Sequence, residues 1–537
     1  MGLLLLIPVA LLLYNFYGIY YRLYLSPIAH IPGPKLAAIT RLYEAYYDLI
    51  LGGKYTFKII DLHKQYGPII RISPWEIHIS DPDFYDTVYA SSASGQRRDK
   101  YDWFTKSFGM DSSTFATPQH DLHKLRKAAL APYFSMQSVR RLQPVIQERL
   151  DLLLERLREF RDKDEVLMAS WAFAAYTNGN YLFNLQEVLG RLLMEVDIVM
   201  QYCFGRCDNR LEAEDFDPSY RDASFFGSTA GSFMKHAPWV NNLMQALPMW
   251  AAAALHPAMA SFVAQKRDNL AQIKTIQASS TKSTNDSEIP TIFHSILSSK
   301  LPPQEKTDTR LSDDAQVLTM AGTLTTAWVL EVVMYWLIRQ PDILSKLKAE
   351  LTTAIPDLDM IGTLPLPVLE KLPYLTAVIK EGLRLTYGVS CRLARIDPDN
   401  AMLFTDSDTG KSWTIPPGTP VGMTIVQLHH NEDIFPDSKK FSPERWLDSK
   451  NRVLDKYMVS FSSGSRQCLG INLAHAEMYL GLAAIWRQWG SRECRGVDDV
   501  GVFELYETGL RDVEIESDAF LPIQQPGTKG IRVKAFM

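Results

Sequence analysis

The segment 312–340 constrains the fold more strongly than any other part of this 537-residue sequence. Between Val317 and Ile338 its side chains are almost all apolar, apart from threonines and Glu331. Ser312 can cap a helix at the start, two aspartates favour its positive end, and Pro341 follows it. A helix of this length reaches about 43 Å, and a helix that is apolar on nearly all faces has to be buried on most sides. The segment therefore predicts a long interior helix in a large body.

The rest of the pattern is mainly helical with a minority of strands. Apolar residues recur at intervals of three and four within 119–270, which is the helical period. The β-branched residues on either side of Ser73–Pro74 predict a strand pair within 67–82. Short strands are expected up to about residue 428, followed by a loop-rich stretch that leads to Cys468. We therefore expect a mainly α fold with a minor β subdomain.

Composition and charge exclude several classes of protein. Hydrophobic residues make up 46% and charged residues 22%, which are globular values that exclude wholesale disorder. The net charge of −5 argues against a protein that binds nucleic acid, because such proteins usually carry a basic excess. The five cysteines are few and odd in number, so we do not expect a secreted disulfide scaffold.

The N-terminus has the composition of a membrane anchor. Residues 1–21 carry no charged side chain, and a helix of that length spans about 31 Å, the thickness of a bilayer's hydrocarbon core. The basic residues that follow place the remainder in the cytosol, and the three prolines of 26–34 predict a stiff hinge. We expect a single transmembrane anchor over 1–22, a proline-rich hinge over 23–40 and one large domain over 41–537. The alternative is an apolar helix packed against that domain.

The most informative segment is Phe461–Gly470, which places a cysteine in a glycine-rich loop just before a predicted helix. There the helix dipole and nearby backbone N–H groups would lower the pKa of the Cys468 thiol. Gly464 and Gly470 allow the backbone to approach a flat ligand closely, and Arg466 offers a cation to a carboxylate. A lone thiolate of this kind can bind a haem iron. The alternative, on composition alone, is a buried and inert cysteine.

Two further motifs favour the haem interpretation. Glu381 and Arg384 form a Glu-x-x-Arg pair, and the sequence Phe-Ser-Pro-Glu-Arg-Trp occupies 441–446. Together with Phe-x-x-Gly-x-Arg-x-Cys-x-Gly at 461–470, these motifs stand in the order and approximate spacing of the cytochrome P-450 family. The chain resembles these haem-thiolate monooxygenases over essentially its whole length. The sequences of residues 24–34 and 63–74 resemble those of membrane-anchored filamentous-fungal members of the family, including the trichodiene oxygenase group. This resemblance points to secondary metabolism.

The resemblance implies a set of residues that hold the cofactor, haem b (iron protoporphyrin IX). Cys468 would be the axial ligand of the haem iron, within a loop formed by Phe461, Gly464 and Gly470. Arg466 and Arg395 would bind the haem propionates, whereas the neighbouring Arg392 is a weaker candidate. His123 and Lys127 occupy the places of the family's Trp-x-x-x-Arg pattern. The residues of a buried charge network near the haem would be Glu381, Arg384 and Arg445.

The long helix carries the residues that the family uses on the oxygen side. The resemblance implies that Ala321 and Gly322 open a groove for dioxygen and that Thr325 organises a water for proton delivery. The sequence departs from the family at Leu324, where the usual residue is a carboxylate, and a leucine cannot relay protons. Either water or Thr326 feeds the site, or the chemistry is altered. Glu331 lies two turns further on and is not an obvious replacement.

The resemblance leads to one main hypothesis and two alternatives. The main hypothesis is a monooxygenase that hydroxylates or epoxidises an apolar intermediate, terpenoid or polyketide-derived, in fungal secondary metabolism. The expected partners are NADPH–cytochrome P-450 reductase and membrane lipid but no nucleic acid, and the expected location is the endoplasmic reticulum membrane with the catalytic domain in the cytosol. Leu324 supports the first alternative, a non-oxygenating isomerase, dehydratase or cyclase. The second is a non-enzymatic haem-binding membrane protein.

Overall fold

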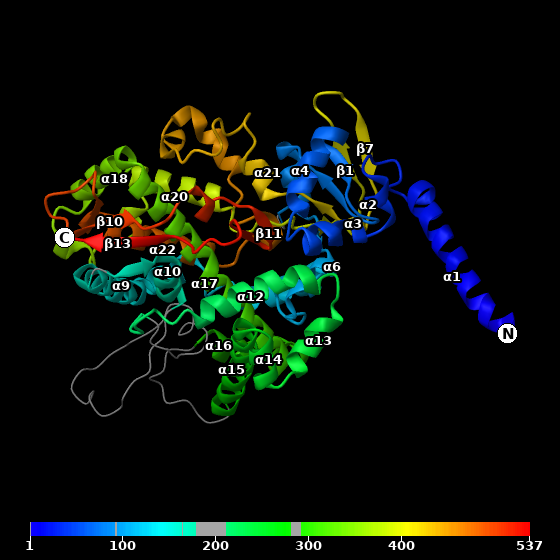
Figure 1. Cartoon of the computed structure of the whole chain (residues 1–537), viewed down its shortest axis with the longest axis horizontal. Helices are drawn as coiled ribbons and strands as arrows, with labels where there is room; N and C mark the ends of the chain where they lie inside the picture. Colours follow the sequence, from blue (N-terminus) through cyan, green and yellow to red (C-terminus); the bar gives the residue numbers. More distant parts are fainter. Residues whose placement is uncertain (1, 92–93, 164, 179–210, 281–290) are drawn as a thin grey trace.

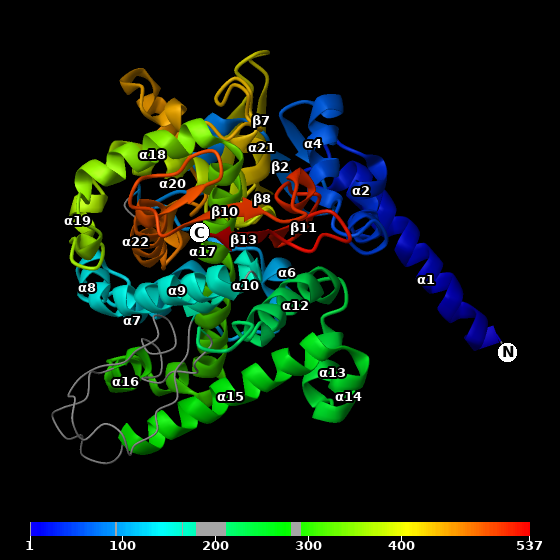
Figure 2. The ribbon, with the colours of Figure 1, turned by 60° about the vertical axis from the view of Figure 1, so that its left-hand side comes forward.

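α17 (Asp308–Arg339) is the central helix of the computed structural model, which describes residues 2–91, 94–163, 165–178, 211–280 and 291–537 (Figure 1). The helices α10, α12, α15, α20 and α22 pack against it, and most of its side chains are buried. The prediction of a long interior helix is therefore confirmed. Figure 2 shows how the other helices surround it.

The start of α17 differs from the prediction, which placed the cap at Ser312. The helix begins four residues earlier, after Thr307, and Ser312 is buried inside it. The two aspartates that follow do not serve the helix end. Asp313 accepts a hydrogen bond from the backbone N–H of Ser112 (3.1 Å), and Asp314 accepts one from the N–H of Thr114 (2.6 Å). These carboxylates fasten α17 to the 112–114 loop, a tertiary role that a local pattern cannot reveal.

The helices and strands follow one another along the chain with few long gaps. The principal helices are α1 (Gly2–Tyr20), α4 (Tyr55–Tyr66), α7 (His120–Leu130), α8 (Met136–Arg141), α9 (Gln143–Lys163), α10 (Ala169–Asn178), α12 (Ser219–Met234), α13 (Trp239–Ala246), α14 (Met249–Leu255), α15 (Pro257–Ser280), α16 (Ile292–Ser298), α18 (Pro341–Ala354), α20 (Pro373–Thr386) and α22 (Ile471–Gln488). Short helices are α2 (Lys35–Ile39), α3 (Leu42–Ala45), α5 (Tyr85–Val88), α6 (Asp102–Thr105), α19 (Leu366–Leu369) and α21 (Ile425–His429). The helical prediction for 119–270 is confirmed where the structure describes it, since 179–210 lie outside the described residues.

The strands form small sheets at two ends of the body. One sheet has the order β1-β2-β8-β5-β3 and the other the order β4-β13-β10-β9, and β6–β7 and β11–β12 are hairpins. The bounds are β1 (Ile69–Arg71), β2 (Ile77–Ile79), β3 (Asp99–Lys100), β4 (Val166–Met168), β5 (Arg395–Ile396), β6 (Met402–Thr405), β7 (Ser412–Ile415), β8 (Val421–Gly422), β9 (Trp489–Ser491), β10 (Gly501–Leu505), β11 (Ser517–Ala519), β12 (Leu521–Ile523) and β13 (Arg532–Phe536). β1 and β2 pair antiparallel, with Ile70 opposite His78, which confirms the predicted strand pair.

The hydrophobic core has two main parts. The larger part joins α9, α10, α17, α18, α20 and α22, and the smaller one lies beneath the sheet that contains β1, β2 and β8. The loop before α22, which contains Cys468, and the middle of α17 are both attached to the larger part. This arrangement sets the cysteine loop beside the central helix.

α1 extends away from the body in both views (Figures 1 and 2). Its 19 residues are helical, and side chains such as Leu11, Leu13 and Phe16 are exposed, so α1 is not packed on the domain as the alternative interpretation required. Among the residues that the structure describes, α17 is the one helix that is long and apolar enough to cross a membrane. Because 56% of that stretch is buried, we assign α17 to the protein core.

Candidate functional site

Cys468 lies in a tight loop between a 3₁₀ turn (Gly464–Arg466) and α22, which begins at Ile471. Its backbone N–H donates to the carbonyl oxygen of Phe461 (3.0 Å), which closes the loop, and the Phe461 ring contacts the His475 ring, with centroids 5.2 Å apart. The cysteine side chain is exposed although the loop is packed into the body. A cysteine side chain left open at the start of a buried helix can bind a ligand.

The pKa of the Cys468 thiol is raised, whereas the sequence predicted a lowered value. Desolvation by the protein atoms around the sulfur is the largest cause, although the residue as a whole is exposed, and it outweighs a hydrogen bond from the backbone of Gly470 and the positive charge of Lys127, both of which lower the pKa. The predicted stabilisation from the start of the helix is present but is the smaller effect. A metal ion would remove this proton directly, because a coordinating thiol is deprotonated.

Gly464 is needed for a different reason from the one predicted. Its φ is +75°, and a side chain there would collide with the backbone oxygens of Tyr89 and Ala90. The close approach is therefore to the protein's own chain and not to a flat ligand. At Gly470, by contrast, an added Cβ would meet no atom within 4 Å, which is compatible with open space for a ligand.

Glu381, Arg384 and Arg445 form a buried network, as the resemblance implied. Arg384 donates two hydrogen bonds to the Glu381 carboxylate (2.8 and 2.9 Å), and Arg445 Nε donates a third (3.0 Å). The indole N–H of Trp446 and the backbone N–H of Ser442 each add one at 2.9 Å. Glu381 and Arg384 are fully buried, so removing one partner would strand a charge at a cost of about 3–5 kcal/mol.

His429 connects this network to the segment that leads into the cysteine loop. Its Nδ1–H donates to the carbonyl oxygen of Arg384 (2.9 Å), and its Nε2 accepts from the backbone N–H of Val459 (3.2 Å). Burial lowers the pKa of His429 to about 3, so the ring is neutral. The network therefore positions the chain just before Phe461.

Five basic side chains, buried or half-buried, gather beside the cysteine loop, and the His123 ring among them is neutral. They are Lys100, His123, Lys127, Arg395 and Arg466, from β3, α7, β5 and the loop itself. Burial and the mutual repulsion of these groups lower their pKa values: that of Arg466 falls to about 9 and that of His123 to about 2. Among the described residues none of the five forms an ion pair with a carboxylate.

Backbone carbonyl groups supply the hydrogen bonds that hold these cations. Arg466 donates to Thr117 O (2.6 Å) and to Pro118 O, and Lys100 donates to Phe115 O (2.6 Å). Lys127 donates to the carbonyl oxygens of Ser465 and Gln467, both at 3.1 Å, so it rests directly on the cysteine loop. Buried cations without counter-charges are costly unless an anion binds among them. The two carboxylates of a haem beside Cys468 fit this set of donors.

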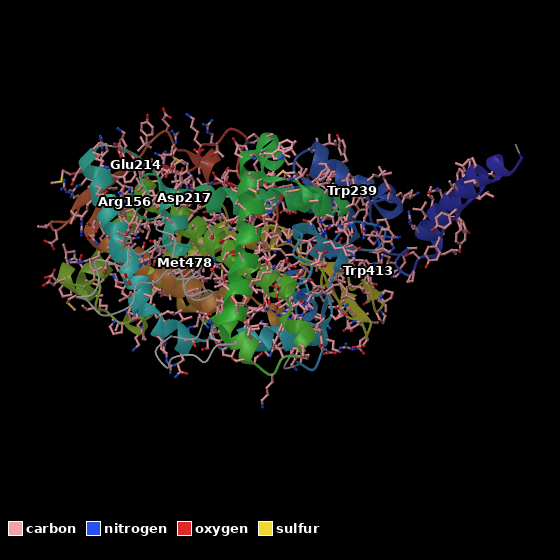
Figure 3. All side chains as sticks on the ribbon, turned by 90° about the horizontal axis from the view of Figure 1, so that it is seen from below. Arg156, Glu214, Asp217, Trp239, Trp413 and Met478 are labelled. Carbon is pink, nitrogen blue, oxygen red and sulfur yellow. The ribbon has the colours of Figure 1, made fainter. Side chains whose placement is uncertain are left out.

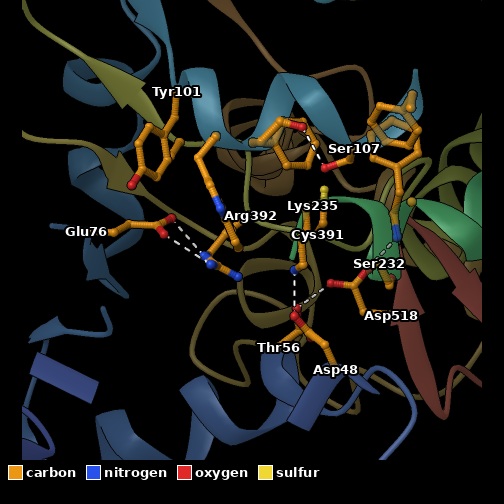
Figure 4. A pocket seen from close by; sticks show the side chains of 16 residues that line it. Asp48, Thr56, Glu76, Tyr101, Ser107, Ser232, Lys235, Cys391, Arg392 and Asp518 are labelled. Carbon is orange, nitrogen blue, oxygen red and sulfur yellow. Dashed lines mark hydrogen bonds and ion pairs between the residues drawn. The ribbon is translucent and has the colours of Figure 1, made fainter. Parts of the chain in front are cut away.

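Arg392 is not available for such an anion. It donates to Glu76 Oε1 and to Glu44 Oε1, both at 2.7 Å, at the edge of a small cavity of about 30 Å³ (Figure 4). Lys235 of α12 reaches Asp48 at 2.6 Å in the same network. Burial raises the pKa of Glu44, but the two cations outweigh it and the net pKa is lowered to about 2. These groups are paired with one another, and the opposite wall of the cavity is aromatic, with Phe104, Phe108 and Phe520.

The middle of α17 has an open face. Ala321 is exposed and Gly322, Leu324 and Thr325 are half-buried, although most of the helix around them is buried. The Thr325 hydroxyl donates to the carbonyl oxygen of Ala321 (2.8 Å), one turn back along the helix. The four positions therefore border open space in the interior, where the resemblance places dioxygen.

Two residues of this region were not predicted from the sequence. Lys100 carries no motif, and only its place on β3, paired with β5 opposite Arg395, brings it into the cation cluster. Glu331 was set aside because it is two turns from Leu324, yet both line one cavity. In each case the signal is a buried charged side chain without a counter-charge, which becomes visible only in three dimensions.

The comparisons with known proteins agree with this site. Residues 45–505 match the family model for cytochrome P-450. The chain is 50% identical over 514 residues to a cytochrome P-450 monooxygenase of Cochliobolus heterostrophus (tpcC). This alignment covers 96% of this chain and 93% of that protein. The chain is 42% identical over 532 residues to such an enzyme of Talaromyces wortmannii (astB), covering 98% and 96%. It is also 36% identical over 537 residues to an N-acetyltryptophan 6-hydroxylase of Emericella nidulans (ivoC), covering 98% and 96%. This chain belongs to the cytochrome P-450 monooxygenase family.

Proposed function

We propose that this protein hydroxylates or epoxidises an apolar small molecule, terpenoid or polyketide-derived, in a fungal secondary-metabolite pathway. The observation that carries the proposal is the cluster of five basic side chains beside the exposed Cys468 side chain, none of which has a carboxylate partner among the described residues. The cluster has the charge and the position needed to hold the two carboxylates of haem b while the thiolate binds its iron. When bound, the haem supplies the activation of dioxygen.

The residues around the cofactor have distinct tasks in this proposal. Cys468 Sγ holds the iron, and the loop from Phe461 to Gly470 shields it. Arg466, Arg395, His123 and Lys127 hold the carboxylates, as predicted, and Lys100 joins them. Glu381, Arg384 and Arg445 keep the loop in place. On the other face, Ala321 and Gly322 leave room for dioxygen and substrate, and Thr325 moves a proton at its hydroxyl oxygen.

The electrons come from NADPH through a separate NADPH–cytochrome P-450 reductase. The exposed lysines Lys124, Lys439 and Lys440 offer a basic surface for an acidic partner. Arg140 pairs with Glu370 (3.3 Å) and Lys127 binds the cysteine loop, so these two side chains are less available for docking.

The proposal places the protein at the endoplasmic reticulum membrane, with residues 1–22 as the anchor, 23–40 as the hinge and 41–537 as the cytosolic catalytic domain. α13 and α14 support it: Trp239 and Trp250 are 67% and 76% exposed, and Trp239 lies on the half of the body nearer to α1 (Figure 3). Large apolar side chains on that surface can enter the lipid phase, from which an apolar substrate would arrive.

The names of the relatives support hydroxylation but not one substrate class. A protein of Fusarium equiseti that is 36% identical to this chain is named tryptophan 6-hydroxylase, and the Emericella nidulans relative acts on N-acetyltryptophan by its name. Both names describe reactions that insert an oxygen atom into the substrate. Leu324 keeps a second candidate open, a rearrangement, dehydration or cyclisation that consumes no oxygen atom.

The test is co-expression with a fungal reductase in a host that is fed candidate precursors under isotopically labelled dioxygen, with Cys468→Ala as the control. We expect a new product that carries the label and is absent from the control. A Cys468-dependent product without the label would replace the monooxygenase proposal by the second candidate. The same product in the control would contradict both.

A further inference from the structure

A cavity runs along α17 from the proposed oxygen side toward Glu331. The volume within it that the centre of a water molecule can occupy is about 60 Å³. Thr323, Leu324 and Thr325 line one end, and Trp328 and Glu331 continue along the same helix. Leu324 and Glu331 are seven residues apart, which is close to two full turns, so they share a helix face. Other elements add polar side chains to the lining, from Ser170, Arg221, Asp512 and Gln524, and apolar ones, from Ala174, Phe225, Leu521 and Pro522.

Glu331 is buried and faces this cavity without a partner. Its residue is 6% exposed, and among the described residues no side chain or backbone group forms a hydrogen bond with its carboxyl group. Arg221 of α12 is the one charge that acts on it appreciably, while Asp512 is already bonded to the Gly509 N–H (2.8 Å) and to Thr528. A buried carboxyl group normally has a hydrogen-bond partner, and here the cavity carries polar side chains on its wall and is large enough for water.

The state of the carboxyl group suits a proton donor. Burial raises the pKa of Glu331 to about 8, and Arg221 lowers it only in part. The group is therefore largely protonated at neutral pH, and it can lose and regain a proton under working conditions. The indole Nε1–H of Trp328, between Glu331 and Thr325 on the helix, is also buried without a partner among the described residues.

We propose that Glu331 supplies protons to Thr325 through water in this cavity, and so replaces the acid that is missing at Leu324. The inference rests on the proposed function and adds to it a positioning role for Glu331, which acts on the oxygen site through Thr325. Six residues of α-helix separate Glu331 from Thr325, about 9 Å along the axis. Two or three waters bridge that distance, and at about 10–15 Å³ each they fit the cavity.

The proton transfers balance at each step. The Glu331 carboxyl group gives its proton to the adjacent water, the water chain passes one proton on, and Thr325 Oγ1 receives one as its own hydroxyl proton moves toward the oxygen site. Glu331 then regains a proton from solvent at the Arg221 end, where the arginine side chain is 26% exposed. No group is oxidised or reduced, and each proton delivered is replaced by one from water.

Glu477 is a matched control for this inference. It is also a buried glutamate, with a pKa raised well above its ordinary value by burial, and it bonds the side chain of Thr326. It lies on α22 and does not line the cavity. If any buried carboxyl group near α17 could supply the proton, Glu331→Gln and Glu477→Gln would have the same effect.

The first test is infrared titration of the purified, haem-loaded protein between about pH 6 and about pH 10, a range that brackets the raised pKa. We expect the C=O band of a protonated carboxyl group to titrate near pH 8, to be absent from Glu331→Gln and to remain in Glu477→Gln. A band that titrates near pH 8 and survives Glu331→Gln would overturn the inference, as would the absence of a band near pH 8 in the unaltered protein. This readout does not depend on turnover.

The second test measures product formed and hydrogen peroxide released per NADPH. Glu331→Gln should lower product per NADPH about ten- to a hundredfold and raise peroxide release, because the general acid is lost. Leu324→Glu in the Glu331→Gln protein should restore coupling, which a merely structural defect would not allow. Unchanged coupling in Glu331→Gln, or an equal loss in Glu477→Gln, would overturn the inference. Failure of the unaltered enzyme to form a labelled product would instead contradict the proposed function.

Discussion

At the scale of single residues, Lys100 shows how a basic side chain can help to bind a cofactor while it destabilises the cofactor-free protein. Its side chain is 5% exposed, its ammonium group lies over the Phe115 ring (3.3 Å to the centroid), and burial lowers its pKa well below the ordinary value. Arg395 and Arg466 repel it further. A residue in this position is unfavourable unless an anion binds beside it.

We predict that Lys100→Met weakens haem retention without destabilising the haem-free protein. A charge-assisted hydrogen bond contributes about 1.5–3 kcal/mol, so haem transfer to a scavenger protein should be about ten- to a hundredfold faster. The urea midpoint of the haem-free protein should stay the same or rise, because a buried unpaired cation is gone. Lys439→Met, at an exposed lysine, is the control. Normal haem retention in Lys100→Met would contradict the role of the cluster.

The sequence identified those site residues that belong to continuous motifs. Glu381, Arg384 and Arg445 meet in the structure because the motifs that contain them are parts of one network. Lys100 and Glu331 belong to no motif, and each acquires its meaning from a neighbour that is distant in sequence or from a cavity. The pKa of Cys468 was mispredicted because the helix dipole can be inferred from sequence, whereas the depth of burial cannot.

At the scale of elements, boundaries were less predictable than the elements themselves. α17 was expected from its apolar length, but Ser312, Asp313 and Asp314 were taken for its cap. Asp313 and Asp314 contact the 112–114 loop instead, and an acidic residue near a helix start looks the same in both roles. In α13 and α14, the structure leaves two apolar side chains, Trp239 and Trp250, exposed.

We predict that α1 and the α13–α14 surface bind the membrane together. Removal of residues 1–22 should leave a protein that still binds lipid vesicles weakly, and Trp239→Ser and Trp250→Ser in that protein should each lower vesicle affinity about tenfold, because a buried large apolar side chain contributes about 1.5–3 kcal/mol. Sedimentation with vesicles measures this.

The control for this prediction is Val497→Ser. Val497 is fully exposed in the loop between β9 and β10, and β10 lies at the end of the body opposite α1 (Figure 1). If it lowers vesicle affinity as much as Trp250→Ser does, binding is not specific to the α13–α14 surface. Full release of the shortened protein, with no residual affinity for vesicles, would contradict a second contact.

At the scale of the whole molecule, buried titratable groups of opposite kinds set the dependence of stability on pH. Burial lowers the pKa of several histidines, to about 3 for His429 and about 4 for His63, His430 and His475. In the unfolded chain these groups titrate near pH 6.5. Below that pH the unfolded state binds more protons, so acidification destabilises the fold by up to about 1.4 kcal/mol per histidine per pH unit.

The buried carboxyl groups act in the opposite direction. The pKa of Glu331 is raised to about 8 and that of Glu477 is also raised by burial, so the folded state holds their protons while the unfolded chain loses them near pH 4.5. Their contribution to stability is complete below about pH 4.5 and declines as the pH rises through the folded pKa. Between about pH 4.5 and 6.5 the four histidines outnumber these two carboxyl groups. Above about pH 6.5 the histidine effect levels off and the carboxyl effect remains.

We therefore predict that the free energy of unfolding is greatest near about pH 6.5 and falls on both sides, more steeply toward acid. Urea midpoints followed by circular dichroism, at a series of pH values on either side of that maximum, measure the two slopes. Glu331→Gln should flatten the alkaline slope, because one of its two carboxyl groups no longer titrates, and should leave the acid slope dominated by the histidines. His429→Gln removes a hydrogen-bonded ring and should make the acid slope shallower. A midpoint that rises steadily from pH 6.5 to about pH 8 would contradict this balance of buried groups.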